Sequence, residues 1–172
     1  MIRRAVTADI DSVERHYTEL LAFESEHGSR TNWKSGVYPT RRVAEKGVED
    51  GSLFVLEEKG DLCASMLLNH VQPEVYASIP WQYPAEAEKV LVIHTLCVPP
   101  SCAGKGIGTR MVRFAEKEAG ARECQVLRLD TWEHNAPAAS LYRRLGFRYA
   151  GIAAVMFEGC IAENLIFFEK EI

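Results

Sequence analysis

The feature that most constrains the fold of this chain is a long apolar segment followed at once by a glycine-rich turn. Residues 89–98, KVLVIHTLCV, are apolar at almost every position and contain several β-branched side chains. Such a run, without polar alternation, predicts a central strand covered on both faces of a sheet. Pro99 and Pro100 end it, and glycines at positions 104, 106 and 108 open a segment that predicts a helix up to Ala119.

The turn between this strand and this helix has the properties of an anion site. The first N–H groups of a helix have no partner within the helix, and that end carries a positive partial charge. Glycine lets a phosphate approach these amides closely, and Lys105 and Arg110 add positive charge. A glycine-rich turn without any ligand is the alternative.

Two other phosphate-binding loops fit this segment less well. The Walker A pattern requires GxxxxGK[ST], whereas Gly104-Lys105 is followed by Gly106 and no glycine lies five residues before Gly104. The dinucleotide pattern requires GxGxxG near a first strand. Here the spacing is GxGxG and the strand lies in the middle of the chain.

The rest of the chain predicts further alternating strands and helices, joined by two long loops at 29–39 and 72–88. Turn residues and hydrophobic periodicity give the boundaries. We expect a strand at 2–6, a helix at 8–27 with Thr7 or Asp9 as N-cap and Gly28 at its end, a helix from Thr40 to Val48, a hairpin of 52–58 and 62–71, a strand at 125–131, a helix at 136–145 capped by Gly146, and an antiparallel pair at 147–157 and 161–169. No internal repeat or domain boundary is visible, which predicts one domain over residues 1–172.

Composition narrows the class of protein. With 172 residues, 47% hydrophobic and 26% charged, the chain resembles an ordinary globular domain. A net charge of -4 disfavours a nucleic-acid partner. No apolar run is long enough to span a membrane, and MIRRAVTADIDSVE has no apolar core of a secretory signal. Five cysteines without a CxxC pair predict reduced thiols, no metal site and a cytoplasmic location.

The glycine turn resembles the CoA-pyrophosphate loop of the GNAT superfamily of N-acetyltransferases, usually written (R/Q)xxGxG. The match falls on residues 103–108, AGKGIG, and departs at Ala103, where Arg or Gln is usual. A second family motif, NxxAxxLYxxxGF, is filled at every position from Asn135 through Tyr142 to Phe147. Two motifs in the right order are far more specific than one. The resemblance is close over residues 89–149. Towards both ends of the chain it rests only on the order of the predicted helices and strands.

The resemblance implies an α/β (α+β) GNAT fold, with a central mixed, mostly antiparallel sheet of six to seven strands flanked by about four helices. It implies an enzyme that moves an acetyl group from acetyl-CoA to a primary amine of a small molecule, by direct attack in a ternary complex and without a metal. Two alternatives stay open: acetylation of a protein N-terminus or lysine, and a non-catalytic acyl-CoA sensor. A homodimer is compatible with this family.

The resemblance also implies which residues hold the cofactor. The backbone of Leu96, Cys97 and Val98 would pair with the pantetheine arm, and the Val98 amide is a candidate oxyanion donor. Asn135 would cap its helix and also reach the cofactor. The pyrophosphate would be bound by Ala103, Gly104, Lys105, Gly106, Ile107, Gly108 and Thr109, with weaker contact at Ala103.

Two side chains are candidates for proton transfer. Tyr142 would reprotonate the CoA thiolate, although its helical spacing also fits a core tyrosine. His94 is a polar residue in an apolar strand, on the face of Val92 and Leu96, and would take the amine proton directly or through water. A hydrogen-bonded core histidine is the alternative. Weaker candidates for the base are Glu24, Glu26, His134, Glu74, Glu86 and Glu88.

Aromatic residues are concentrated in the two long loops. In this fold these segments wall the acceptor pocket, and Trp33, Tyr38, Tyr76, Trp81 and Tyr83 lie in them. Such a pocket would suit an apolar or cationic amine. The alternative is that these rings only cover the edge of the sheet.

Overall fold

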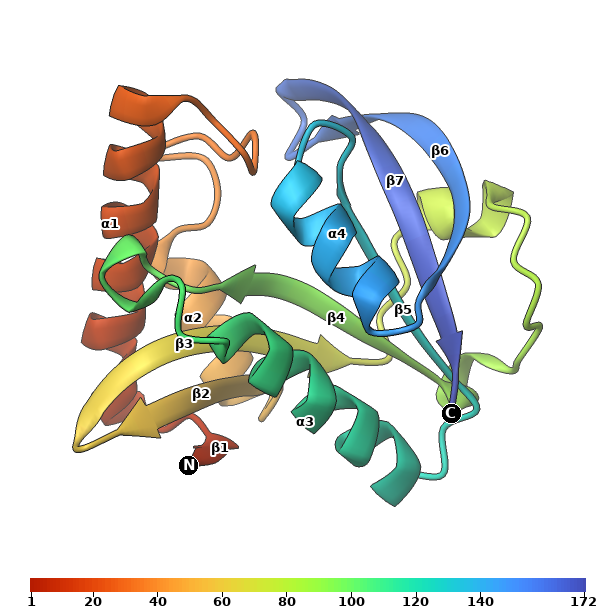
Figure 1. The fold of residues 1–172 in the computed structure, drawn as a ribbon, viewed down its shortest axis with the longest axis horizontal. Coiled ribbons are helices and arrows are strands. Elements are labelled where there is room, and N and C mark those ends of the chain that lie inside the picture. The colour runs from red at the N-terminus through yellow and green to blue at the C-terminus, as the bar shows by residue number, and fades with distance from the viewer. The chain divides into compact units, whose positions relative to one another are not determined.

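The computed structural model describes all 172 residues, Met1–Ile172. Seven strands follow the order β1-β2-β3-β4-β5-β7-β6, in which β4 and β5 are parallel and the pairs β1–β2, β2–β3, β5–β7 and β6–β7 are antiparallel (Figure 1). The bounds are β1 (Ile2–Arg4), α1 (Ile10–His27), α2 (Arg41–Glu49), β2 (Leu53–Glu58), β3 (Asp61–Asn69), β4 (Val90–Cys97), α3 (Ile107–Ala121), β5 (Val126–Trp132), α4 (Ala136–Arg144), β6 (Arg148–Phe157) and β7 (Ile161–Glu171). The predicted mixed sheet with four helices is confirmed.

The chain forms two compact units. Unit 1 comprises Met1–Ser29, Trp33–Leu68 and His94–Phe114, and unit 2 comprises Arg30–Asn32, Asn69–Ile93 and Ala115–Ile172. Strand β4 and helix α3 each contribute residues to both units. That residues 1–172 act as one domain stays a prediction.

Unit 1 is built around α1, α2 and the hairpin of β2 and β3. Val13 and Tyr17 on α1 pack with Leu53 and Val55 on β2 in one buried cluster. Gly47 lets α2 approach this layer closely, because a Cβ there would lie 2.5 Å from Leu67 Cδ2 and 2.9 Å from Leu53 Cβ. The helical periodicity of α1 therefore positions the layer from which the second half of β4 emerges.

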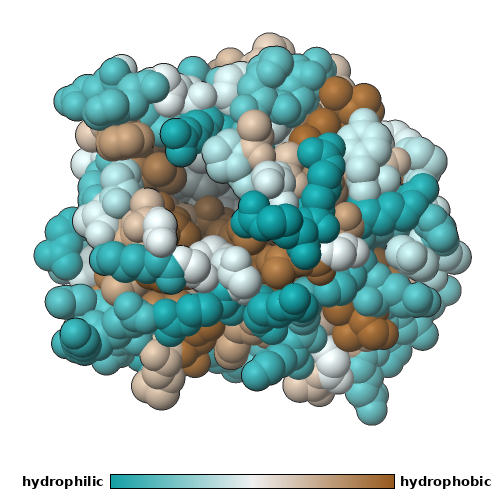
Figure 2. Space-filling model, viewed as in Figure 1, coloured by the Kyte–Doolittle hydropathy of each residue, from teal (hydrophilic) through white to brown (hydrophobic).

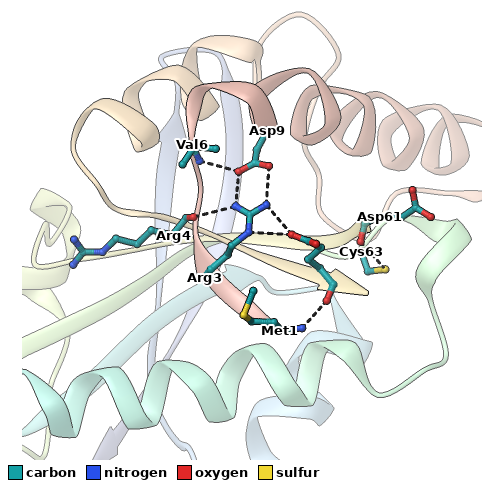
Figure 3. Close-up of polar contacts among 8 residues, drawn as sticks. Met1, Arg3, Arg4, Val6, Asp9, Asp61 and Cys63 are labelled. Carbon is teal, nitrogen blue, oxygen red and sulfur yellow. Dashed lines mark hydrogen bonds and ion pairs between the residues drawn. The ribbon is translucent and has the colours of Figure 1, made fainter. Parts of the chain in front are cut away.

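An ion-pair network fixes the start of the chain to this layer (Figure 3). The Arg3 guanidinium donates to both oxygens of Asp9, at 2.7 and 3.0 Å, and to Glu57 Oε2 at 2.9 Å. Asp9 Oδ2 also accepts the Val6 N–H at 2.8 Å. These hydrogen bonds from Arg3 lower the pKa of Asp9. Asp9 occupies the predicted N-cap position of α1, but its side chain makes no cap hydrogen bond to that helix.

Other predicted boundaries shift by a few residues. Strand β1 ends at Arg4 rather than residue 6, and α1 begins after a short helical turn at Thr7–Asp9. Thr40 occupies the N-cap position of α2 without a side-chain cap hydrogen bond. Helix α4 ends at Arg144 with Leu145 as its C-cap, and Gly146 follows at φ +85°. None of the helices combines the length and apolar character required to cross a bilayer.

Unit 2 has one layer on each face of its strands. On one face, Tyr76 and Trp81 from the loop after β3 pack on Phe167 of β7, with centroid separations of 5.4 and 6.1 Å. On the other face, Tyr142 of α4 lies 5.8 Å from the ring of Phe168. In Figure 1, α4 accordingly lies across β5 and β7.

The proline-rich loop is tied to β7 by a fully buried carboxylate. Glu169 Oε1 accepts the backbone N–H of Gln82 at 2.7 Å, and Oε2 accepts that of Tyr83 at 3.3 Å. Arg148 on β6 donates to the same Oε1 at 3.0 Å. Because hydrogen bonds to a charged group contribute more than neutral ones, Glu169 explains why this irregular segment is ordered.

We expect Glu169→Gln to lower the free energy of unfolding by about 1.5–3 kcal/mol, the range for hydrogen bonds to charged groups. The amide keeps the shape of the side chain but loses one acceptor and the charge that Arg148 neutralises. Urea unfolding measures the change. Glu171→Gln is the matched control, because Glu171 lies on the same strand but is exposed. Equal losses in the two variants would contradict an anchoring role.

Candidate functional site

The second half of β4 holds a strained residue. Thr95 stands at φ +49° inside the strand, a conformation that a β-branched residue rarely adopts. Strain of this kind costs about 1–3 kcal/mol and persists where the surroundings enforce it, often at functional positions. The hydroxyl of Tyr38, from the loop between α1 and α2, hydrogen-bonds the Thr95 hydroxyl. Tyr38 in turn packs edge-on against Trp33, at 5.7 Å between ring centroids.

The neighbours of Thr95 divide into buried and partly exposed positions. Thr95 and Cys97 are buried, whereas His94 and Leu96 are partly exposed. Burial raises the pKa of the Cys97 thiol, so this side chain stays protonated within the core of unit 1. Val92, expected on the same face as His94 and Leu96, is fully buried, so a shared face for these three residues stays a prediction. The parallel ladder of β4 with β5 covers Val90–Ile93 and Val126–Leu129, while β4 continues to Cys97 and β5 to Trp132.

The glycine turn precedes α3 and is open to solvent. Gly104 and Gly106 stand at φ +76° and +71°, where a side chain would be strained, and nothing lies within 4 Å of a Cβ built on either. The first hydrogen bond of the helix runs from the Arg110 N–H to the Gly106 carbonyl at 3.1 Å. The amides of Ile107, Gly108 and Thr109 therefore precede the helical ladder and are available to an anion.

The polar groups beside this turn are partly engaged. Lys105 donates to the Ser101 carbonyl at 3.2 Å, and Arg110 forms an ion pair with Glu58. The Ala103 N–H donates to the Pro100 carbonyl at 3.1 Å, so this amide closes the preceding turn. The amides of residues 107–109 thus precede the helical ladder, whereas that of Ala103 is already paired, and pyrophosphate binding by these residues stays a prediction.

In unit 2, α4 begins where the sequence predicts and ends one residue earlier, with Leu145 rather than Gly146 as its C-cap. Asn135 caps it, since its Oδ1 accepts the Ala138 N–H at 3.2 Å. The Tyr142 ring is buried against Phe147 and Phe168, both at 5.8 Å between centroids. Burial, followed by the nearby charge of Asp130, raises the pKa of Tyr142, so its hydroxyl holds a proton.

Strand β5 carries a partly exposed carboxylate next to this core. Asp130 Oδ2 accepts the hydroxyl of Tyr76 at 2.8 Å. Burial raises the pKa of Asp130 to about 6, and the hydrogen bond from Tyr76 acts in the opposite direction. A carboxyl group with this pKa changes its charge close to neutral pH.

Beyond Asp130, a groove of about 670 Å³ opens where β5 ends beside the hairpin of β6 and β7. Two of its acidic side chains are held by amides: Asn32 Nδ2 donates to Glu163 at 2.8 Å, and Asn164 Nδ2 donates to Glu133 at 2.9 Å. The groove is lined by Asn32, Trp132, Glu133, His134, Ala154, Val155, Met156, Ala162, Glu163 and Asn164. Its acidic and aromatic character suits a cation. No group of three or more His, Cys, Asp or Glu side chains is arranged to hold a metal ion.

Comparison with protein families identifies this arrangement. Residues 14–147 match the model of the acetyltransferase (GNAT) family. The chain belongs to the GNAT family. Among curated proteins, it is 37% identical over 74 residues to a streptothricin acetyltransferase of Streptomyces lavendulae, an alignment that covers 43% of this chain. The matched segment spans 39% of that relative's length.

Solved GNAT structures share the fold over almost the whole chain. An acetyltransferase of the GNAT family from Streptococcus agalactiae superposes with a TM-score of 0.82 at 22% identity, covering 100% of this chain and 95% of the other. A GNAT phosphinothricin acetyltransferase from Sinorhizobium meliloti, in complex with acetyl-CoA, gives a TM-score of 0.72 at 17% identity, covering 100% and 88%. At these identities the likeness establishes the fold.

The aromatic residues that were predicted to line the acceptor pocket of this GNAT protein lie in two separate groups. Trp33 and Tyr38 lie together beside Thr95 in unit 1. Trp81 packs in the core of unit 2, donates its indole N–H to the Tyr76 carbonyl at 2.7 Å and lies 4.2 Å from the Arg128 guanidinium. The backbone carbonyl of Tyr83 accepts a hydrogen bond from the Arg128 guanidinium at 2.9 Å. Trp81 and Tyr83 thus have structural contacts, and their roles in substrate binding stay predictions.

The weaker candidates for the base differ in their exposure and position. Glu24 is buried and accepts Ser29 Oγ at 3.0 Å, whereas His134 lines the groove. Glu26, Glu74, Glu86 and Glu88 are exposed. Sequence reasoning missed Asp130. A signal was available, since Arg128 and Asp130 are polar residues at alternating positions of an otherwise apolar strand.

Proposed function

We propose that this chain transfers the acetyl group of acetyl-CoA to a primary amine of a small molecule. The observation that carries the proposal is the open glycine turn, whose amides at Ile107, Gly108 and Thr109 precede the first hydrogen bond of α3. A helix start of this kind binds phosphate oxygens. Family membership and the neighbour that binds acetyl-CoA support the same cosubstrate.

The proposed reaction is direct attack of the amine on the thioester. Leu96, Cys97 and Val98 would hold the pantetheine arm through their backbone, and the Val98 amide would stabilise the oxyanion. Tyr142 would protonate the departing thiolate, a role that rests on the family motif. Burial and nearby Asp130 raise its pKa, which keeps the hydroxyl protonated and also makes it a weaker acid. Asn135 would reach the cofactor from the start of α4. These residue roles are proposals that rest on the family motifs.

A small-molecule acceptor is favoured by the names of two relatives. One is a streptothricin acetyltransferase and another a phosphinothricin acetyltransferase. The acidic groove in unit 2 supports an acceptor that carries positive charge, since Glu133 and Glu163 both line it. An alkyl amine has a pKa of about 10.4 and arrives protonated at neutral pH.

We expect purified protein to release CoA thiol from acetyl-CoA only when an amine is supplied. The panel would contain mono- and polyamines, amino acids and peptides with free N-termini or lysine. Faster release with small cationic amines than with peptides supports the proposal. Release with peptides alone would assign the chain to protein acetylation. Binding of acetyl-CoA without release across the whole panel would favour a sensor and overturn the proposal.

We also propose a cytoplasmic location, because all five cysteines are free thiols. Most of the surface visible in Figure 2 is hydrophilic, and apolar side chains gather near the centre of the view. Ile152 and Met156 are exposed on β6, at the end of the strand order, and would suit a homodimer contact that sedimentation detects.

A further inference from the structure

Asp130 is an inward-facing carboxylate without a cation. Its hydrogen-bond partner is the neutral hydroxyl of Tyr76, at 2.8 Å to Oδ2, and no Lys, Arg or His forms an ion pair with it. Placing a carboxylate in a poorly solvated site costs free energy unless a positive charge compensates it. Yet the side chain is partly exposed, and Oδ1 is not among the fully enclosed atoms that lack a partner. Oδ1 therefore keeps some exposed surface.

The charged side chains near Asp130 form hydrogen bonds or ion pairs with other residues. Arg128, two residues earlier on β5, donates to Gln72 at 2.7 Å and to the Tyr83 carbonyl at 2.9 Å, and stacks on Trp81. Glu169 on β7 is paired with Arg148 at 3.0 Å. Tyr142 on α4 is neutral. No side chain of unit 2 forms an ion pair with Asp130, so a cationic ligand would supply the charge that the ionised carboxylate lacks.

The groove begins two residues further along β5, at Trp132. Alternate residues of a strand share a face, so Asp130 and the groove residue Trp132 lie on the same face of β5. They are about 6.6 Å apart along the strand, at about 3.3 Å per residue. A cation drawn in by Glu133 and Glu163 and packed on Trp132 would reach Asp130 with its leading ammonium group.

We infer that Asp130 binds the ammonium group of the acceptor and accepts its proton, with Tyr76 as a positioning residue. This inference rests on the proposed acetyl transfer. One N–H bond of the ammonium breaks as an O–H bond forms on Asp130. The nitrogen lone pair forms the bond to the acetyl carbon while the C–S bond breaks. The second nitrogen proton passes to water, Tyr142 regains from water the proton that it gives to the sulfur, and Asp130 returns its own proton to water.

The acidity of Asp130 suits this step. Only the ionised carboxylate can accept a proton, so the rate should rise with pH through a value near the Asp130 pKa of about 6. The raised pKa of Asp130 has the opposite effect on the stability of the fold, which decreases as the pH rises. Because the folded pKa lies above the ordinary value of 3.8, ionisation of Asp130 destabilises the fold as pH rises from about 4 to 6.

Asp130→Asn tests the inference directly. The amide can still accept from Tyr76 but cannot take a proton, so kcat/KM should fall by about 10²-fold, a usual size for a general base. Its melting temperature at pH 7.5 should be unchanged or higher, and the shift caused by acetyl-CoA should persist. Asp61→Asn, at an exposed position, is the control. A near-wild-type rate in Asp130→Asn, or equal losses in both variants, would overturn the inference.

Tyr76→Phe adds a second measurement, the pH dependence of kcat/KM, which would not change if Tyr76 had only a structural role. The hydrogen bond from Tyr76 lowers the pKa of Asp130, so its loss should shift the acid limb of kcat/KM to higher pH. The profile is compared for two amines of different pKa, since substrate ionisation also gives a limb. If the limb near pH 6 disappears in His94→Gln and survives in Asp130→Asn, His94 is the base and the inference fails. An inactive wild type on every amine would instead refute the proposed function.

Discussion

Acetyl-CoA is expected to raise the melting temperature of this protein, and Gly106→Glu to abolish the rise. At 100 times Kd, a ligand that binds only the folded state stabilises it by about 2.7 kcal/mol. For a chain of this size that corresponds to roughly 5–10 °C. The Gly106 position is open, so the new side chain fits, but it places a carboxylate where the α3 amides would receive a phosphate. Charge repulsion and loss of the close approach should therefore act together.

Gly159→Glu is the control for this experiment. Gly159 has nearly the same backbone conformation, φ +70° against +71°, and equally open surroundings in the turn between β6 and β7. Both variants carry the same strain and the same added charge, which leaves position as the difference. We expect the control to keep the full acetyl-CoA shift despite a lower starting melting temperature. No shift for the wild type at millimolar acetyl-CoA, or the same shift in both variants, would refute the assignment of the loop.

The strand, turn and helix around Gly106 could be predicted because every signal in them is local. Apolar residues define β4, two prolines end it, and alternating glycines open α3. The cap of α4 by Asn135 is local in the same sense, since its partner is the Ala138 N–H three residues on. Asp9 stands at the N-cap position of α1 without a cap hydrogen bond, because other groups engage its carboxylate. Arg3 and the Val6 N–H engage its carboxylate, and Glu57 on β2 holds Arg3 in place.

The candidate site was harder to predict because it depends on contacts between distant segments. Trp81 packs on Phe167, which lies 86 residues later, so sequence alone could not distinguish this ring from one that faces a substrate. Asp130 acquires its unusual pKa from burial and from Tyr76, both consequences of the folded loop. Residue types suggested the chemistry, and the fold selected which carboxylate is placed to perform it.

Tyr142→Phe should lower kcat by about 10²-fold or more, the usual size of a general acid contribution. The Tyr142 ring is buried, but its hydroxyl makes no hydrogen bond and is not among the enclosed atoms that lack partners. Removal of the oxygen therefore leaves the contacts with Phe147 and Phe168 in place. Folding and the acetyl-CoA shift should be retained, because the glycine turn is unchanged. Steady-state thiol release and thermal unfolding measure the two properties separately.

Tyr149→Phe provides the matched comparison. Tyr149 contacts the same Phe168, at 6.1 Å between centroids, but lies exposed on β6. Loss of a hydroxyl there should leave the rate unchanged. A general acid also predicts that a thioester with a more acidic leaving thiol suffers less from Tyr142→Phe, because a stable thiolate needs no proton to depart. If Tyr142→Phe only lowers the melting temperature and turns over acetyl-CoA as fast as Tyr149→Phe, Tyr142 is a packing residue and the thiolate takes its proton from water.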